Sequence, residues 1–160
     1  LAKGNFLTPG AKVQPSVPAA LHPLPGGLPA DRVTLAKWLV DRGNPLTARV
    51  TVNRIWARLF GRGIVETEED FGTQGSLPTH PELLDDLAVD FMDRGWDVKR
   101  TMGEIVTSAT YRQSSAVRLD DMEKDPANRL LSRYPRQRLD AETVRDQALS
   151  LAGELSSKML

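Results

Sequence analysis

The chain has no cysteine and only two histidines among its 160 residues. The lack of cysteine excludes disulfides, thiolate metal sites, a cysteine nucleophile and covalent attachment of a c-type haem within this sequence. The two histidines, His22 and His80, lie far apart in the sequence and form no metal-ligand motif such as HExxH. We therefore expect this segment to hold neither a metal ion nor a haem.

Long apolar runs and an excess of charge of one sign are also missing. No apolar run approaches the roughly 20 residues that span a bilayer, and no signal peptide is visible. Lys plus Arg and Asp plus Glu number 21 each, which argues against a nucleic-acid-binding protein. The chain begins Leu1-Ala2-Lys3 without a methionine, so we expect it to be a piece of a longer protein.

Proline is concentrated at the start of the chain. Residues 1–30 contain six of the eleven prolines. Because proline fixes φ and removes a backbone donor, this composition predicts an extended Pro/Gly-rich arm. A helical pattern follows, and we expect one helical domain at residues 31–155 and a short truncated tail at residues 156–160.

Capping residues and apolar spacing predict an all-α fold, a single orthogonal multi-helix domain. Asp31, Asp97 and Asp140 stand where helix N-caps are expected, and Gly61 stands where a helix should end. Residues 79–82 have the spacing of a capping box, and no segment shows convincing strand alternation. The predicted helices cover residues 31–43, 45–60, 80–93, 98–110, 125–131 and 141–155, and residues 114–124 are predicted as a polar loop.

Several polar side chains fall within the apolar faces of these helices when each is placed on a 100° wheel. A buried arginine must be paired, since an isolated buried charge costs several kcal/mol, so Arg49 and Arg145 should be mostly buried in structural salt bridges. The alternative is a pocket for an anion or a sugar, because guanidinium groups bind carboxylate, phosphate or sulfate in pairs of hydrogen bonds. The candidate pocket residues are Arg49, Asn53, His80, Arg112 and Arg145, and the candidate structural partners are Asp70, Asp90, Asp140 and Glu142.

No catalytic template is complete in the sequence. Ser108, Ser114 and Ser115 have no base placed beside them, and no Gly-x-Ser-x-Gly turn occurs. Carboxylate pairs such as Asp85-Asp86 are adjacent on a helix and usually point apart into water. Catalytic residues therefore stay unassigned, and the sequence leaves open whether the chain is an enzyme.

A set of short strings runs along residues 44–146 in the order NPLTARV, NRIW, FGRG, DFG, PTHPELLD, TYRQSS, DPANRLL and RLDAETVRD. In this combination they resemble the planctomycete-type domain of unknown function 1553. Members of that family typically form the C-terminal part of large exported proteins, often with a c-type cytochrome domain upstream. The resemblance implies an extracytoplasmic setting, a c-type haem in an upstream domain and partners among the upstream domains of the same polypeptide. It supplies no catalytic residue.

Three functions follow as hypotheses. The first is a binding or scaffolding module that packs against the upstream domains. The second is an enzyme or binding domain that acts on polysaccharide or another anionic substrate through an arginine-rich pocket. The third, nucleic-acid binding, is disfavoured by the zero net charge.

Overall fold

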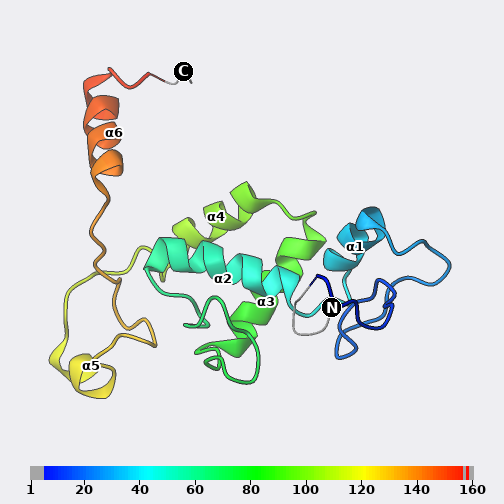
Figure 1. Ribbon diagram of the computed structural model, residues 1–160. Coiled ribbons are helices and arrows are strands. Elements are labelled where there is room, and N and C mark those ends of the chain that lie inside the picture. Colours follow the sequence, from blue (N-terminus) through cyan, green and yellow to red (C-terminus); the bar gives the residue numbers. More distant parts are fainter. Residues whose placement is uncertain (1–5, 157, 159–160) are drawn as a thin grey trace.

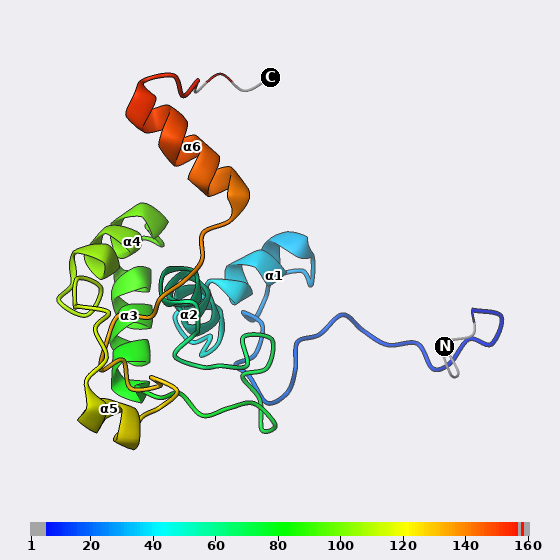
Figure 2. The same cartoon turned by 90° about the vertical axis from the view of Figure 1, so that its left-hand side faces the viewer.

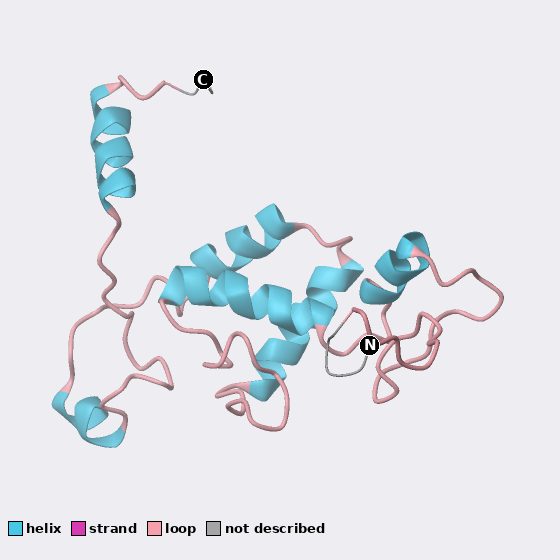
Figure 3. Ribbon diagram, viewed as in Figure 1, coloured by secondary structure: helices cyan, strands magenta, loops and turns pink. Residues whose placement is uncertain are grey.

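The computed structural model describes residues 6–156 and residue 158. Within this part the protein is all-α, with no strand (Figures 1 and 3). The predictions for residues 1–5 of the arm and for residues 157, 159 and 160 of the tail lie outside the described residues. The helices are α1 (Arg32–Leu39), α2 (Thr47–Phe60), α3 (Pro81–Asp93), α4 (Val98–Thr107), α5 (Leu119–Lys124) and α6 (Ala141–Ala152).

Helices α2, α3 and α4 pack on one another and form the centre of the molecule (Figures 1 and 2). Their apolar faces and the segment after α2 enclose one cluster of buried side chains. Burying a large apolar side chain contributes about 1.5–3 kcal/mol, so this cluster is the main source of stability. Its members are Ala48, Val52, Trp56, Phe60, Ile64, Val65, Leu84, Ala88, Phe91 and Ile105.

The predicted N-caps are confirmed at Asp31, Asp97 and Asp140. Each carboxylate accepts a hydrogen bond from the backbone N–H three residues further on, at 2.8, 3.0 and 2.7 Å respectively. These bonds satisfy donors that the first helical turn leaves free. Gly61 ends α2 in the left-handed conformation, at φ 77°, as the sequence predicts.

The predicted capping box at residues 79–82 is wrong. His80 is the N-cap of α3 and makes no capping hydrogen bond through its side chain. Thr79 instead turns toward the segment after α2, where both its backbone N–H and its hydroxyl donate to the carbonyl oxygen of Ile64, at 2.9 and 3.3 Å. The start of α3 is therefore fixed by a tertiary contact rather than by a local one.

The prediction for residues 114–131 is also wrong. A helix lies in the segment predicted as a loop, and a loop lies in the segment predicted as a helix. Helix α5 occupies part of the predicted polar loop, and the predicted helix at residues 125–131 is a loop. The carboxylate of Asp125 accepts hydrogen bonds from the backbone N–H groups of Arg129 and Leu130, at 2.9 and 2.7 Å. Asn128 and Leu131 then adopt positive φ angles of 52° and 56°, which no α-helix permits.

The ends of the described chain leave the central helices. Residues 6–31 contain no helix or strand and are attached at His22, whose carbonyl oxygen accepts a hydrogen bond of 2.7 Å from Trp38 Nε1. The two rings stack with centroids 4.8 Å apart. At the other end α6 projects away from α2, α3 and α4 (Figure 2) and has no buried residue. No described helix combines the length and apolar character needed to cross a membrane.

Candidate functional site

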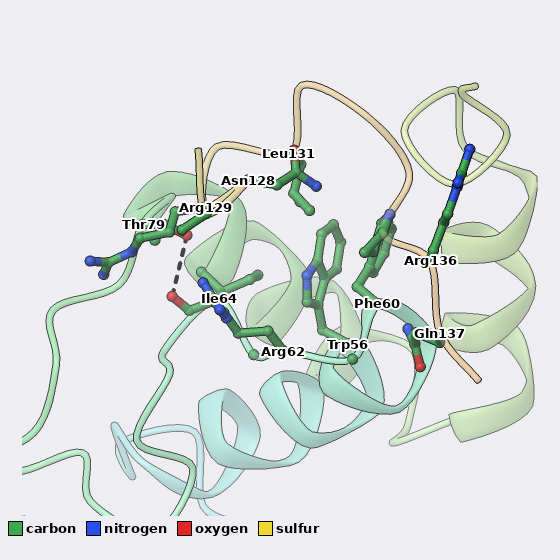
Figure 4. A pocket seen from close by; sticks show the side chains of 14 residues that line it. Trp56, Phe60, Arg62, Ile64, Thr79, Asn128, Arg129, Leu131, Arg136 and Gln137 are labelled. Carbon is green, nitrogen blue, oxygen red and sulfur yellow. Dashed lines mark hydrogen bonds between the residues drawn. The ribbon is translucent and has the colours of Figure 1, made fainter. Parts of the chain in front are cut away.

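Two adjoining cavities lie along the returning segment 127–137, and the first of them lies where this segment meets the end of α2. The first has a volume of about 200 Å³, and Trp56 and Phe60 extend from α2 toward Asn128 and Leu131 of that segment (Figure 4). The second has a volume of about 300 Å³ and shares Asn128 and Arg136 with the first. The second cavity is lined by Ser115, Val117, Asn128, Arg133, Tyr134, Pro135 and Arg136.

The returning segment is held at the end of α2 by long-range contacts. The hydroxyl of Tyr134 and the side-chain amide of Gln137 both donate to the carbonyl oxygen of Leu59, each at 3.1 Å. The Tyr134 ring also packs edge-on against Tyr111 and lies 6.0 Å from the Phe60 ring. These contacts satisfy a carbonyl of the last turn of α2 and close the cavities on one side.

Tyr134 is a neutral phenol at physiological pH. Its partial burial, together with the interaction with the neighbouring Tyr111 side chain, raises the pKa of Tyr134 to about 12. An effective general base has a pKa close to the pH at which it works. A phenol with a pKa of about 12 therefore does not act as a general base near neutral pH. Its role at the site is to position the segment that carries the arginines.

The lining of the cavities is positively charged. Arg62, Arg129, Arg133 and Arg136 line one or both cavities, and among the described residues no aspartate or glutamate lines either of them. Glu66 lies close by, with its carboxylate oxygens 3.7 Å from Arg62 and 3.9 Å from Arg129. The carboxylates of Glu66 and Asp125 lie near four guanidinium groups, so the site keeps a net positive charge, which suits an anion.

Hydrogen bonds of Asn128 and Asp125 hold the loop that carries Arg129 and Arg133. Asn128 donates to the carbonyl oxygen of Arg133 at 2.8 Å and accepts from its backbone N–H at 3.3 Å. Burial alone raises the pKa of Asp125, but hydrogen bonds from the backbone of Leu130 and Arg129 and the charge of Arg133 outweigh it and lower the pKa. Asp125 is therefore ionised, and its carboxylate stabilises the loop by accepting backbone hydrogen bonds.

The structure does not bring the predicted pocket residues together. Asn53 is fully buried, as the wheel predicts, and exchanges hydrogen bonds of 3.0 and 2.9 Å with the carbonyl oxygen and N–H of Val65. Nδ1 of His80 contacts the Thr79 hydroxyl at 2.9 Å at the start of α3. Asn53 fixes the backbone, and His80 lies at a helix terminus.

Two of the arginines that the helical wheel places within apolar faces are exposed, so that part of the prediction is wrong. The Arg145 side chain is 73% exposed and pairs with Asp146 of its own helix at 3.2 Å, because no described residue covers that face of α6. Arg112 is exposed and donates to the carbonyl oxygen of Ser108 at 3.4 Å. A ligand-binding role for these side chains stays a prediction, and it does not involve a shared pocket with Arg49 and Asn53.

The four candidate carboxylate partners serve local structure in different ways. Asp70 accepts a hydrogen bond from the backbone N–H of Gly72 at 2.7 Å, and Asp90 pairs with Arg94 one turn further along α3 at 2.9 Å. Asp140 caps α6. Glu142 is exposed in the first turn of α6, where its charge favours the helix N-terminus.

Arg49 is paired with Asp85, a carboxylate that the sequence analysis expected to point into water. Its Nε donates to Asp85 of α3 at 2.6 Å, and its Nη1 donates to the carbonyl oxygen of Pro45 at 2.7 Å. The Arg49 side chain is hydrogen-bonded, as predicted, and is 36% exposed, so it is partly rather than fully enclosed. It lies at the edge of the interface between α2 and α3, where water screens the pair.

Because the pair is partly exposed, its contribution to the stability of the fold is small. We expect Arg49→Ala to lower the free energy of unfolding by about 1 kcal/mol, and Asp85→Asn in the same background to change it little further. The hydrogen bond from Arg49 lowers the pKa of Asp85. The pair therefore stabilises the fold above the unfolded carboxyl pKa of about 3.9, and this contribution is lost as pH falls through the lowered folded value.

Urea denaturation of the double-mutant cycle at pH 7 and pH 3 measures both effects, with Arg58→Ala as the exposed control. A loss of 3 kcal/mol or more would contradict the surface placement.

The arginines of the two cavities were missed at the sequence level. Residues 129–138 contain Arg129, Arg133, Arg136 and Arg138, a density of arginine found nowhere else in the chain. That run, which extends from the end of one predicted helix toward the start of the next, is the signal that could have indicated the site. Arg62 has no such signal, because it joins the others only through the return of residues 127–137 to the end of α2.

These features define an all-α module with a three-helix centre and an arginine-lined site at the end of α2. Residues 31–160 match the family model PSD1, described as a protein of unknown function (DUF1553), and the chain belongs to this family. No curated protein and no solved structure shows a significant match to the chain.

Proposed function

We propose that this chain is a binding module that docks on a neighbouring domain of a longer protein through the apolar face of α6. The observation that carries this proposal is the exposure of that face. Val144 is 52% exposed, Leu151 is 86% exposed and Leu155, just beyond the helix, is 47% exposed. These residues recur at helical spacing and lie on one side of α6, together with Ala148 and Ala152.

A helix of this kind needs a partner. Isolated helices shorter than about 12–15 residues are marginal in water, and most of their stability in proteins comes from packing an apolar face. The N-cap Asp140 and the left-handed Gly153 define the ends of α6 but do not supply that packing. An amphipathic helix with an uncovered stripe fits the recognition mode in which a helix lies in an apolar groove.

The occupant that we propose is another domain of the same polypeptide. The resemblance of the sequence to a family with upstream domains supports this choice. The exposed apolar surface of α1 and its C-cap also supports it, since Val33 and the C-cap residue Val40 are 61% and 51% exposed. In the same proposal the longer protein is extracytoplasmic and carries a c-type haem upstream. A CxxCH motif encoded upstream of this segment is the expected sign of that haem.

A pair of neighbouring substitutions tests the docking proposal. Leu151→Asp places a charge on the apolar face, whereas Ser150→Asp places the same charge on the other side of the same turn. In the isolated chain we expect both to change the free energy of unfolding by less than about 1 kcal/mol, because neither side chain is buried. In the longer protein we expect only Leu151→Asp to release α6.

Limited proteolysis of the longer protein measures that release. Cleavage within residues 141–155 should accelerate at least about tenfold in the Leu151→Asp variant relative to wild type, because an undocked helix samples open conformations. The Ser150→Asp variant should be cleaved at the wild-type rate. Equal cleavage of the two variants would show that the apolar face of α6 is not an interface.

A further inference from the structure

Arg133 lies in the second cavity with one end of its guanidinium group unpaired. Its Nη2 donates to the carbonyl oxygen of Pro126 at 3.2 Å. Its Nη1 is buried and has no hydrogen-bond partner among the described residues. A buried donor on a charged group that lacks a partner costs free energy, and the penalty is greater than for a neutral donor.

The neighbouring carboxylate does not fill this place. The charge of Arg133 contributes to the lowered pKa of Asp125, but the two Asp125 oxygens accept the backbone N–H groups of Arg129 and Leu130. No ion pair within 4.0 Å joins Arg133 to a carboxylate in the described part of the chain. Asp125 therefore orders the loop and leaves Nη1 of Arg133 without an acceptor.

Two further donors reach the same cavity. Arg136 lines it and donates through Nε to the hydroxyl of Ser115 at 3.4 Å, and Ser115 also lines it. Asn128 lines the cavity too, but its amide is used by the backbone of Arg133. The groups offered to a ligand are thus two guanidiniums and a hydroxyl, with no lining carboxylate to compete.

We propose that this cavity binds a small oxyanion: phosphate, sulfate or a carboxylate group. Such a ligand accepts from Nη1 of Arg133 and from Arg136, and Ser115 supplies a third hydrogen bond. Arginine forms charge-assisted hydrogen bonds to all three groups. The volume of about 300 Å³ is at the lower end of the range of small-molecule sites, which favours a small anion or the anionic end of a larger molecule. This site is independent of the docking of α6.

The test is a titration of the chain with inorganic phosphate, sulfate and acetate at constant ionic strength, against sodium chloride. We expect calorimetry to detect saturable binding of at least one oxyanion, and the same anion to raise the Tm more than chloride does. Preference for phosphate and sulfate identifies a tetrahedral ligand, and preference for acetate identifies a carboxylate. Responses to all three that do not exceed the response to chloride would overturn the proposal.

Matched variants locate the binding. Arg136→Gln should weaken binding at least about tenfold, because it removes a charge-assisted hydrogen bond. Ser115→Ala should weaken it by a smaller factor. Arg138→Gln removes an exposed arginine that lines neither cavity and should bind as wild type does.

Arg133→Gln should abolish binding. Because Arg133 also contacts the loop, that variant is used only if its circular dichroism and unfolding transition match those of wild type. The test otherwise rests on Arg136→Gln and Ser115→Ala, whose side chains lie at the rim of the cavity. Unchanged affinity in both of these variants would place the anion elsewhere and overturn the proposed site.

Discussion

Replacing Asn53 with alanine is expected to lower the free energy of unfolding by about 3 kcal/mol. Asn53 is fully buried in α2, and its amide bonds both backbone polar groups of Val65. The substitution leaves the N–H and the carbonyl oxygen of Val65 buried without partners, and each stranded group costs about 1–3 kcal/mol. Chemical denaturation followed by circular dichroism measures the loss.

Two companion variants sharpen this expectation. Asn53→Asp keeps the shape and the acceptor for the Val65 N–H, but it sets a buried carboxylate against the Val65 carbonyl oxygen. It should therefore destabilise at least as much as alanine. Arg54→Ala, at the next and exposed position, should change the free energy by less than about 0.5 kcal/mol. Similar small effects at positions 53 and 54 would show that residues 63–65 are not fixed by α2.

The second large effect is expected at Gly63. A Cβ atom at this buried position would lie 2.6 and 2.8 Å from the Asn53 amide atoms and would also collide with the carbonyl oxygen of Val65. Real Cβ atoms do not approach so closely, so the segment must move and break the bonds of Asn53. We expect Gly63→Ala to destabilise by about 2–4 kcal/mol, a range typical of buried network disruption.

Gly103→Ala provides a control, because we expect it to raise the free energy of unfolding rather than lower it. Gly103 lies on an exposed turn of α4, and no described atom beyond its chain neighbours and the backbone of its own helix lies within 4 Å of an added Cβ. Alanine there removes the entropic penalty of a helical glycine and should stabilise the chain by about 0.5–1 kcal/mol. Thermal denaturation should move the Tm of the two variants in opposite directions. A Gly63→Ala variant as stable as wild type would contradict the close approach of residue 63 to α2.

The helices could be predicted from the sequence because their signals are local. Asp31, Asp97 and Asp140 each precede an apolar stripe, and each bonds the N–H three residues on. The placement of Asn53 in the interior also followed from the phase of one helix. Such features depend on neighbours within one or two turns, which the sequence shows directly.

The exchange of helix and loop at residues 114–131 could not be predicted in this way. The Asp125-Pro126 pair is a good helix start, yet the Asp125 carboxylate bonds two N–H groups and folds the chain into a turn. Aspartate side chains offer the backbone this alternative to a helix. The positive φ of Asn128 and of Leu131 then completes the loop, and a leucine gives no local sign of that conformation.

The error at Arg145 has a different cause. The wheel identifies an apolar face correctly but assumes that the face is covered within the chain. The face of α6 is not covered within the described residues, so Arg145 at its edge is exposed. The cavity arginines show the converse. Residues 75 and 78 positions away donate to the carbonyl oxygen of Leu59 and bring the arginine-rich segment to the end of α2, and no local pattern predicts that contact.

Amide hydrogen exchange of residues 141–152, compared between the isolated chain and the longer protein, tests the docking of α6 most directly. In the isolated chain we expect α6 to exchange within about tenfold of the unfolded rate, while α2 is strongly protected. In the longer protein we expect the protection of α6 to rise at least about a hundredfold and that of α2 to stay high. Equal protection of α6 in the two proteins would contradict the account.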